Sequence, residues 1–279
     1  MKTIEGENVT IGYGDTTIID SLDVAIPKGK VTVLIGGNGC GKSTLLRSLS
    51  RLLKPDAGQI ILEGADISKM RTKEIAKKMA VLPQSPTAPE GLTVLQLVKQ
   101  GRYPYQSWAK QWSKKDEEAV TKALEAANMT DFQDRPVDSL SGGQRQRAWI
   151  AMILAQNTET LLLDEPTTYL DMTHQIDILD LLFDLNKQYG RTIVMVLHDL
   201  NLACRYADHI IAIKDKTIYS QGKPEDIISC DLVRNVFHME CQVTEDPLFG
   251  TPLCIPYGKG RCLFNKVEDK HEKSAFKIG

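Results

Sequence analysis

The sequence predicts an α/β fold built around a parallel β-sheet. Residues 31–35, 161–163 and 193–197 form three short runs that are almost entirely apolar. Such runs are typical of strands that are covered on both faces, as the strands of a parallel sheet are. Each run is followed by glycine or by polar and charged residues, and open parallel sheets bind ligands beyond the carboxyl ends of their strands. The three strand ends therefore predict a functional site at one edge of the sheet.

The first 26 residues predict a separate antiparallel β layer. Apolar and polar residues alternate on both sides of a turn at residues 12–15, as expected for two half-buried strands. The apolar positions of this pattern are Val9, Ile11, Leu22, Val24 and Ile26. Further along the chain, residues 58–62 and 80–82 predict short strands, with a helical segment at 72–78 between them.

Helices are predicted around and between these strands. A helix over 42–53 follows the first buried strand, and another over 173–188 carries apolar residues at helical spacing. Residues 93–156 contain no convincing strand, which predicts an inserted helical subdomain at about 86–156. Its expected helices cover 93–100, 114–128 and 143–156. The last expected elements are a strand pair within 208–220 and a helix over 224–237.

The composition is that of an ordinary globular protein without an excess of positive charge. The 34 basic and 36 acidic residues give a net charge of −2, so no nucleic-acid partner is expected. No apolar run approaches the ~18 residues of a membrane span, and the first residues lack a signal peptide, so the chain is expected in the cytosol unless a partner holds it elsewhere. The six cysteines form no C-x-x-C pair and are expected to be free thiols. The mixed-charge tail from Lys259 is expected to be solvated and partly disordered.

Residues 36–43 fit the phosphate-loop pattern G-x-x-x-x-G-K-[ST], between a predicted strand and a predicted helix. The glycines allow the backbone N–H groups to point at a phosphate, and the start of the helix adds partial positive charge. Lys42 can reach the β- and γ-phosphates, and Ser43 can ligate Mg²⁺. The residues assigned to nucleotide binding here are Gly36, Gly37, Asn38, Gly39, Cys40, Gly41, Lys42, Ser43 and Thr44.

Two carboxylates follow the apolar strand at 161–163. In P-loop NTPases an aspartate at such a strand end holds Mg²⁺, which predicts this role for Asp164. Glu165 is then placed to orient or deprotonate the attacking water. Two acids at a strand end could also be a simple solvated turn, but the phosphate loop favours the hydrolytic interpretation.

The segment Leu-Ser-Gly-Gly-Gln at 140–144 precedes the acidic strand. With this signature the chain resembles the ATP-binding-cassette (ABC) ATPases, a family of P-loop NTPases. The resemblance implies a nucleotide-binding domain over 3–240, followed by a C-terminal extension and charged tail over 241–279. It also implies a head-to-tail homodimer, in which the signature of one subunit faces ATP bound to the phosphate loop of the other. The signature residues assigned to nucleotide binding are Ser141, Gly142, Gly143 and Gln144.

Four further positions match the family in sequence order. Gln84 matches the glutamine that contacts Mg²⁺ or its water, and His198 matches the switch histidine that contacts the γ-phosphate. Residues 168–171 match the D-loop of the family, whose aspartate, here Asp171, reaches across the dimer. Tyr13 matches the aromatic residue that stacks on adenine. The residues assigned to the metal are Ser43, Gln84 and Asp164, and those assigned to catalysis are Glu165 and His198.

Two segments, 82–105 and 246–256, resemble the ATPases of bacterial iron–siderophore importers. The resemblance implies an ATP-hydrolysing subunit that energises import of iron(III)–siderophore complexes from the cytoplasmic face of the cell membrane. The implied partners are an integral-membrane permease, which would dock on the segment from Gln84 to about residue 110, and indirectly a substrate-binding lipoprotein. Tyr103, Trp108 and Trp112 in or near this region are explained equally well by docking and by packing within the helical subdomain.

Other functions are alternatives to siderophore import. Related ATPases serve cobalamin or haem importers, and the cargo never enters this subunit, so no residue here names it. A DNA-repair cassette would need long heptad repeats or a basic surface, and an exporter ATPase would be expected to carry a fused membrane domain. A non-catalytic nucleotide-binding module would be expected to lack some of the assigned catalytic residues, whereas Lys42, Asp164, Glu165 and His198 are all present.

Overall fold

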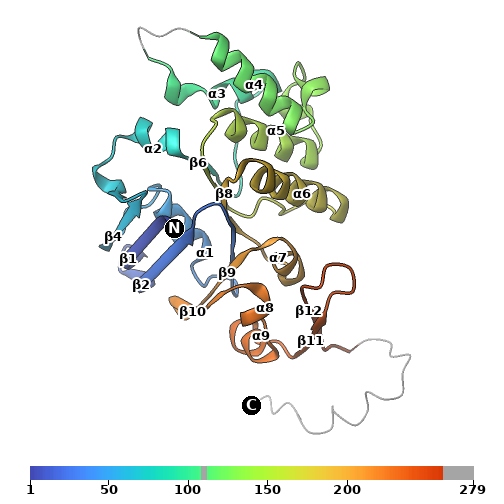
Figure 1. Cartoon of the computed structure of the whole chain (residues 1–279). Coiled ribbons are helices and arrows are strands. Elements are labelled where there is room, and N and C mark those ends of the chain that lie inside the picture. The colour runs from blue at the N-terminus through green and yellow to red at the C-terminus, as the bar shows by residue number, and fades with distance from the viewer. Residues whose placement is uncertain (108–111, 260–279) are drawn as a thin grey trace.

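The centre of the fold is a six-stranded sheet, seen in the computed structural model, which describes residues 1–107 and 112–259. The sheet contains β3 (Val31–Ile35), β6 (Met79–Leu82), β7 (Thr160–Leu163), β8 (Thr192–Val196), β9 (His209–Lys214) and β10 (Thr217–Gly222), in the order β10-β9-β3-β8-β7-β6. All neighbours are parallel except β10, which returns antiparallel from β9. Strands β3, β7 and β8 are buried throughout, which explains their uninterrupted apolar sequences. The predicted α/β fold with a parallel core sheet is confirmed (Figure 1).

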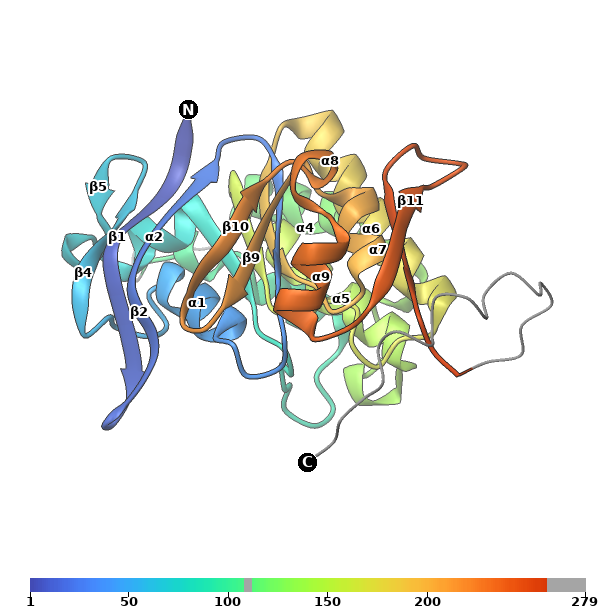
Figure 2. The same ribbon diagram turned by 90° about the horizontal axis from the view of Figure 1, so that it is seen from below.

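A second sheet is antiparallel and contains most of the N-terminal residues. It consists of β1 (Lys2–Tyr13), β2 (Thr16–Pro27), β4 (Ala57–Leu62) and β5 (Ala65–Asp66), in the order β2-β1-β4-β5. The turn between β1 and β2 lies where the sequence predicted it. Figure 2 shows the long β1–β2 hairpin on one side of the molecule and the C-terminal helices and strands on the other.

The helix that follows the phosphate loop, α1 (Lys42–Leu49), is shorter than predicted. Arg51 adopts a left-handed φ of 60°, and its N–H and that of Leu52 bond back to the carbonyl oxygens of Ser48 and Arg47. This pair of bonds satisfies the last helical carbonyls and ends the helix. The prediction of a helix to residue 53 therefore missed a C-terminal cap that depends on the conformation of one arginine.

The chain between β6 and β7 is helical in its described part. It contains α3 (Val94–Gln100), α4 (Lys114–Ala126), α5 (Gly142–Ala155) and the short 3-10 helices η2 (Tyr103–Tyr105), η3 (Thr130–Phe132) and η4 (Val137–Ser139). Thr93, Ser113 and Ser141 cap the three α-helices. Each hydroxyl group accepts a hydrogen bond from the backbone N–H of the residue three positions later, whose side chain in turn accepts one from the backbone N–H of the cap residue. These local capping signals explain why the helices begin close to where the sequence predicted them.

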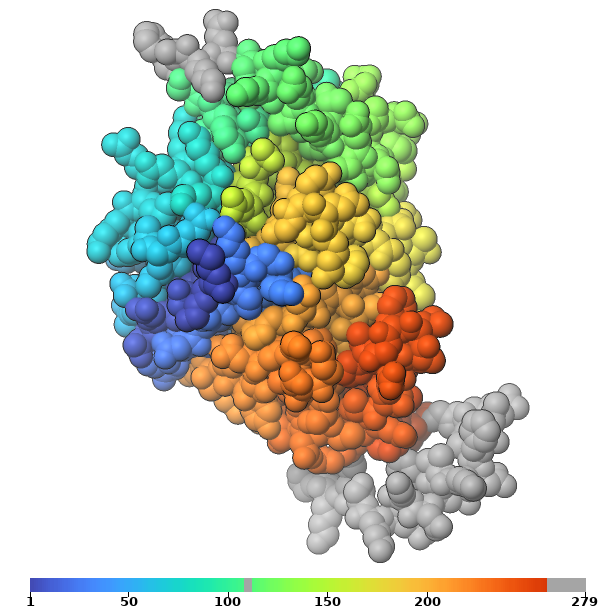
Figure 3. All heavy atoms as spheres, in the orientation of Figure 1, coloured from blue at the N-terminus to red at the C-terminus, as the bar shows by residue number. Residues whose placement is uncertain are grey.

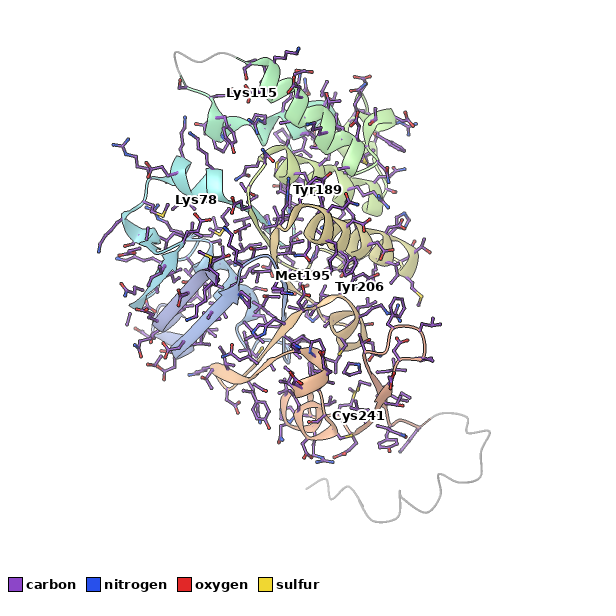
Figure 4. All side chains as sticks on the ribbon, in the orientation of Figure 1. Lys78, Lys115, Tyr189, Met195, Tyr206 and Cys241 are labelled. Atoms are coloured by element: carbon purple, nitrogen blue, oxygen red, sulfur yellow. The ribbon has the colours of Figure 1, made fainter. Side chains whose placement is uncertain are left out.

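The remaining helices pack on the central sheet, on the antiparallel layer or on neighbouring helices. They are η1 (Ile67–Lys69), α2 (Thr72–Lys78), α6 (Met172–Tyr189), α7 (Leu200–Tyr206), α8 (Pro224–Ile227) and α9 (Cys230–Phe237). Because strand residues alternate between faces, Val33 of β3 and Met195 of β8 pack with α5 and α6, whereas Leu34 of β3 packs with α1 and the antiparallel layer. Figure 4 shows Met195 near the middle of the fold.

The C-terminal part differs from the prediction in two places. The single helix expected over 224–237 is interrupted, because Ser229 leaves the helical conformation and caps α9. An unpredicted hairpin follows, formed by β11 (Cys241–Glu245) and β12 (Pro252–Pro256). Asp246 holds its turn by accepting hydrogen bonds from the N–H groups of Leu248 (2.9 Å) and Phe249 (3.2 Å). The predictions for the tail beyond residue 259 and for Trp108 fall outside the described residues.

Candidate active site

The phosphate loop joins the end of β3 to the start of α1. Gly36 and Gly41 have φ angles of 151° and 103°, in the region that favours glycine. A Cβ atom on Gly36 would lie 2.4 Å from the carbonyl oxygen of Ile213 and 2.7 Å from Cys40 Sγ. No larger residue fits there, so glycine is required for the loop to curl over the end of its strand.

Lys42 lies inside this loop. Its Nζ atom donates hydrogen bonds to the carbonyl oxygens of Gly36 (3.0 Å) and Gly37 (2.9 Å), and the residue is only 5% exposed. Cys40 Sγ lies 3.8 Å from the same nitrogen. A buried ammonium group whose hydrogen-bond acceptors are neutral carbonyl oxygens attracts an anion strongly, because little water solvates its charge. The loop therefore has the charge and the shape to bind a phosphate.

Asp164 joins the end of β7 to the phosphate loop. Its Oδ1 atom accepts a hydrogen bond of 2.6 Å from the Ser43 hydroxyl group. The Oδ2 atom is buried and has no hydrogen-bond partner in the described part of the chain. Burial raises the pKa of Asp164, and the hydrogen bond from Ser43 offsets this effect only in part. This uncompensated carboxylate oxygen beside a serine hydroxyl is a suitable pair of ligands for a divalent cation.

Glu165 lies at the meeting point of three strand ends. Its Oε1 atom lies 2.7 Å from His198 Nε2, and its Oε2 atom accepts from Gln84 Nε2 (2.7 Å) and Thr168 Oγ1 (2.9 Å). Burial raises the pKa of this carboxyl group, but the bonds to His198, Thr168 and Gln84 outweigh it and hold the pKa below its usual value. Glu165 is thus an ionised, oriented base at neutral pH. The structure brings Glu165 and His198 together, as their places after two buried strands predicted, and it adds Gln84, which the resemblance assigned to the site.

The backbone of Glu165 is also strained. Its φ angle of 52° lies in the left-handed region, which non-glycine residues rarely adopt and which costs roughly 1–3 kcal/mol. Tyr169, a few residues later in the same turn, has a φ of 64° and is 91% exposed. Strain of this kind accumulates at functional sites, where the rest of the fold enforces the geometry.

The signature and the D-loop form the starts of α5 and α6. Ser141 caps α5 through the N–H of Gln144 (3.3 Å), and Asp171 caps α6 through the N–H of His174 (2.9 Å). The signature residues and Asp171 do not line the hollow beside the phosphate loop of their own chain. Within the described chain the side chains of Ser141 and Asp171 bond to Gln144 and His174, and neither bonds to the phosphate loop of its own subunit.

A hollow of about 750 Å³ lies beside the phosphate loop. His198 and residues 36–40 line it, together with three segments that the sequence did not single out. These segments are residues 16–18 of β2, residues 213–216 of the β9–β10 turn and residues 236–238 at the end of α9. Tyr13 is not among the lining residues and lies 49% exposed at the end of β1. The threonines and lysines of these segments match no sequence motif, so their place beside the phosphate loop becomes visible only in the folded structure.

Residues 19–168 match the family model described as ABC transporter. The chain belongs to the ABC transporter family. This ABC chain is 70% identical over 267 residues to the probable siderophore transport system ATP-binding protein YusV of Bacillus subtilis, covering 96% of this chain and 97% of YusV. It is 69% identical over 267 residues to the petrobactin import ATP-binding protein FpuD of Bacillus anthracis, covering 96% and 98%.

The fold of the ABC chain also matches a solved structure, described as an inward-facing ABC transporter of the metal-chelate type. The TM-score is 0.80 and the sequence identity 27%, and the match covers 93% of this chain and 99% of that one. Within the described residues, no helix is long and apolar enough to span a membrane. The ABC chain is thus an ATP-binding cassette, an ATPase subunit of a membrane transporter.

Proposed function

We propose that this chain binds and hydrolyses ATP to energise the import of iron(III)–siderophore complexes through a membrane permease. The observation that supports hydrolysis is the ionised Glu165, oriented by Gln84 and His198 and joined by Asp164 to the phosphate loop. The observation that supports the cargo is the high identity to relatives whose names state siderophore transport and petrobactin import. Cobalamin or haem import is the alternative that the experiment below tests.

Hydrolysis needs a water molecule activated next to the γ-phosphate. Glu165 is the general base in this proposal, because its carboxylate is ionised and held in one orientation by three neighbours. Lys42 and the loop N–H groups stabilise the charge of the transferring phosphoryl group. His198, whose side chain is 46% exposed, completes the side of the site that faces the γ-phosphate.

The residues around Asp164 fit Mg²⁺. The Asp164 Oδ2 atom, which has no hydrogen-bond partner among the described residues, and the Ser43 hydroxyl group are hard oxygen ligands. Gln84 lies nearby, since it donates a hydrogen bond to Glu165, the residue that follows Asp164. When bound with ATP, Mg²⁺ would neutralise charge on the β- and γ-phosphates. Asp164, Ser43 and Gln84 would hold it, and the buried negative charge of Asp164 would then be compensated.

We propose a head-to-tail homodimer as the active form. The backbone N–H groups of Gly142 and Gly143 begin α5 without a partner inside the helix, which is a suitable site for an anion, and in the described chain no hydrogen bond joins them to their own phosphate loop. A second copy would bring its bound ATP to this helix start. Asp171 would cross the same interface from the exposed start of α6.

The proposed partners are an integral-membrane permease and, through it, a substrate-binding lipoprotein, with the ATPase at the cytoplasmic face of the membrane. Tyr103 in the docking segment is 69% exposed, with Lys73 Nζ 5.2 Å from the centre of its ring. Trp112 is 37% exposed and donates a hydrogen bond to Glu117 (2.6 Å). Exposed aromatic rings next to lysines support docking here, while packing within the helical subdomain explains the buried part of Trp112.

Transport assays in a host lacking the gene test the proposed cargo. Cells complemented with the wild-type gene are expected to recover uptake of at least one radiolabelled ferric siderophore from a panel of catecholate, hydroxamate and carboxylate types. Cells complemented with the Glu165→Gln gene are expected not to recover it. Recovery of cobalamin or haem uptake alone would replace the siderophore as the cargo, and recovery of none would overturn the importer role.

Asp164→Asn is expected to stabilise the metal-free protein while abolishing its metal-dependent ATPase activity. Removing the uncompensated buried charge should increase the free energy of unfolding by roughly 1 kcal/mol, or about 2–4 °C in the unfolding midpoint. Because burial raises the pKa of Asp164, the folded state binds the proton more tightly than the unfolded state. Wild-type stability should therefore fall as the pH rises through the pKa of Asp164, and this fall should be absent from the variant.

Thermal unfolding in the presence of a chelator at several pH values measures this effect. Asp184→Asn, an exposed change on α6, is the matched control and should leave the midpoint unchanged. A lower midpoint for Asp164→Asn than for the wild type at neutral pH would contradict the prediction.

A further inference from the structure

The start of the signature helix α5 lies against the start of α6. A Cβ atom built on Gly143 would lie 2.2 Å from Cδ2 and 2.7 Å from Cγ of His174. The imidazole ring of His174 therefore lies directly on the backbone of Gly143, closer than any side chain at position 143 would allow. Glycine in the signature is required here by a neighbour within the same chain, in addition to any ligand.

The same imidazole ring holds the aspartate of the D-loop. His174 Nδ1 lies 2.8 Å from Asp171 Oδ1, and the backbone N–H of His174 donates to the same oxygen at 2.9 Å. These two bonds hold the pKa of Asp171 below its usual value. The Asp171 side chain is 67% exposed, so in the described chain these bonds fix its direction while leaving its second oxygen accessible.

Further contacts also hold the start of α5 against the start of α6. Arg147 of α5 pairs with Asp177 of α6 at 2.8 Å, one turn beyond Gly143 and His174. A Cβ atom on Gly142 would lie 3.8 Å from Leu170 Cδ2. The signature and the D-loop are thus parts of one packed unit. Within this unit, His174 contacts both Gly143 of the signature and Asp171 of the D-loop.

We propose that His174 is a positioning residue that fixes the carboxylate of Asp171 and the signature segment 141–144 relative to each other. The proposal rests on the proposed function, because both motifs would act on ATP held by a second copy of the chain. If the Asp171 carboxylate and segment 141–144 are already held in place, the subunit loses less conformational entropy when the dimer forms than if each had to be ordered separately. His174 acts through Asp171 and Gly143, and it makes no contribution to ATP binding by the phosphate loop of its own subunit.

Three substitutions separate the two contacts of His174. His174→Ala removes both contacts. His174→Asn keeps an N–H group near the position of Nδ1 that can reach Asp171, and His174→Phe keeps a ring on Gly143 without the hydrogen bond. His209→Asn, a partly buried histidine on β9, is the matched control.

Each variant is measured in two ways besides steady-state turnover. The first is the affinity of the isolated subunit, at concentrations below dimerisation, for a non-hydrolysable ATP analogue. The second is ATP-dependent dimer formation in the Glu165→Gln background. We expect unchanged analogue affinity in all variants, and a kcat and a dimer affinity that fall about tenfold or more in His174→Ala, since a hydrogen bond to a charged group is lost. His174→Asn and His174→Phe should fall between the alanine variant and the wild type.

A double-mutant cycle tests the ring contact separately. Gly143→Ala in the wild type forces its methyl group into the His174 ring and should reduce kcat. The same change in the His174→Ala background should cost less, because the obstructing ring is gone. Equal losses in both backgrounds would overturn the packing role of the ring.

The outcomes distinguish this inference from the function on which it rests. A wild-type protein without ATPase activity would overturn the proposed function, and with it the role of His174. An active wild type in which His174→Ala equals the His209→Asn control would overturn the role of His174 alone. A loss of analogue affinity in the isolated subunit that matches the loss of kcat would show a general structural role, and would also overturn the proposal.

Discussion

Glu165→Gln is expected to bind ATP as tightly as the wild type and to hydrolyse it about 10²–10⁴-fold more slowly, the usual contribution of a general base. Glutamine keeps the size of the side chain and can still bond to Gln84 and Thr168, but it cannot accept a proton from water. Because ATP is hydrolysed only after two copies have assembled around it in the proposed homodimer, the variant should accumulate ATP-bound dimers. Turnover assays, nucleotide binding and size-exclusion chromatography with ATP measure these three effects.

Glu159→Gln is the control for this variant. Glu159 precedes the same strand, β7, at the end opposite the site, and pairs on the surface with Lys28 at 2.9 Å. It should hydrolyse ATP at the wild-type rate. Near-normal turnover in Glu165→Gln would mean that another group is the general base. The contacts of Glu165 with His198 and Gln84 would then not serve to orient a general base.

Lys42→Ala is expected to weaken ATP binding by about 10²–10⁴-fold, corresponding to the loss of about two hydrogen bonds to charged phosphate oxygens at roughly 1.5–3 kcal/mol each. Lys42 Nζ also bonds to the carbonyl oxygens of Gly36 and Gly37, so the variant should loosen the loop as well. Titration with a fluorescent ATP analogue measures the affinity. Lys122→Ala on the exposed face of α4 is the control, and an affinity within threefold of the wild type for Lys42→Ala would contradict the role of the loop.

The parts of the fold that the sequence predicted depend on strands that are buried on both faces. Continuous apolar runs such as 31–35 and 193–197 have few other interpretations, because both faces of the strand must be covered. The residues that follow them gather at one edge, since parallel strands end on the same side. For this reason Gly36, Glu165 and His198 could be placed together although up to 162 positions, from 36 to 198, separate them in the sequence, whereas Gln84 was assigned by resemblance.

The missed parts depend on contacts that are distant in the sequence. The β11–β12 hairpin is mostly exposed and is anchored where Cys241 and Cys254 pack on Val233 of α9, so its short sequences show no clear period. The walls of the hollow come from turns near Lys216 and His238, whose residue types are common in any turn. The assignment of Tyr13 to adenine stacking, made by resemblance, stays a prediction, because the lining of the hollow includes neither Tyr13 nor Lys42.

The order of strands in the central sheet has a consequence for synthesis of the chain on the ribosome. Strand β3, which carries the phosphate loop, is paired on one side with β8 and on the other with β9. Both neighbours are translated more than 150 residues after β3, which ends at Ile35, since β8 begins at Thr192. During most of translation, the strand that precedes the phosphate loop therefore lacks both of its partner strands. Until residue 214 has emerged, only chaperones or the antiparallel layer can cover this apolar strand. Premature termination before that point would yield a chain that carries the nucleotide motif and cannot fold around it.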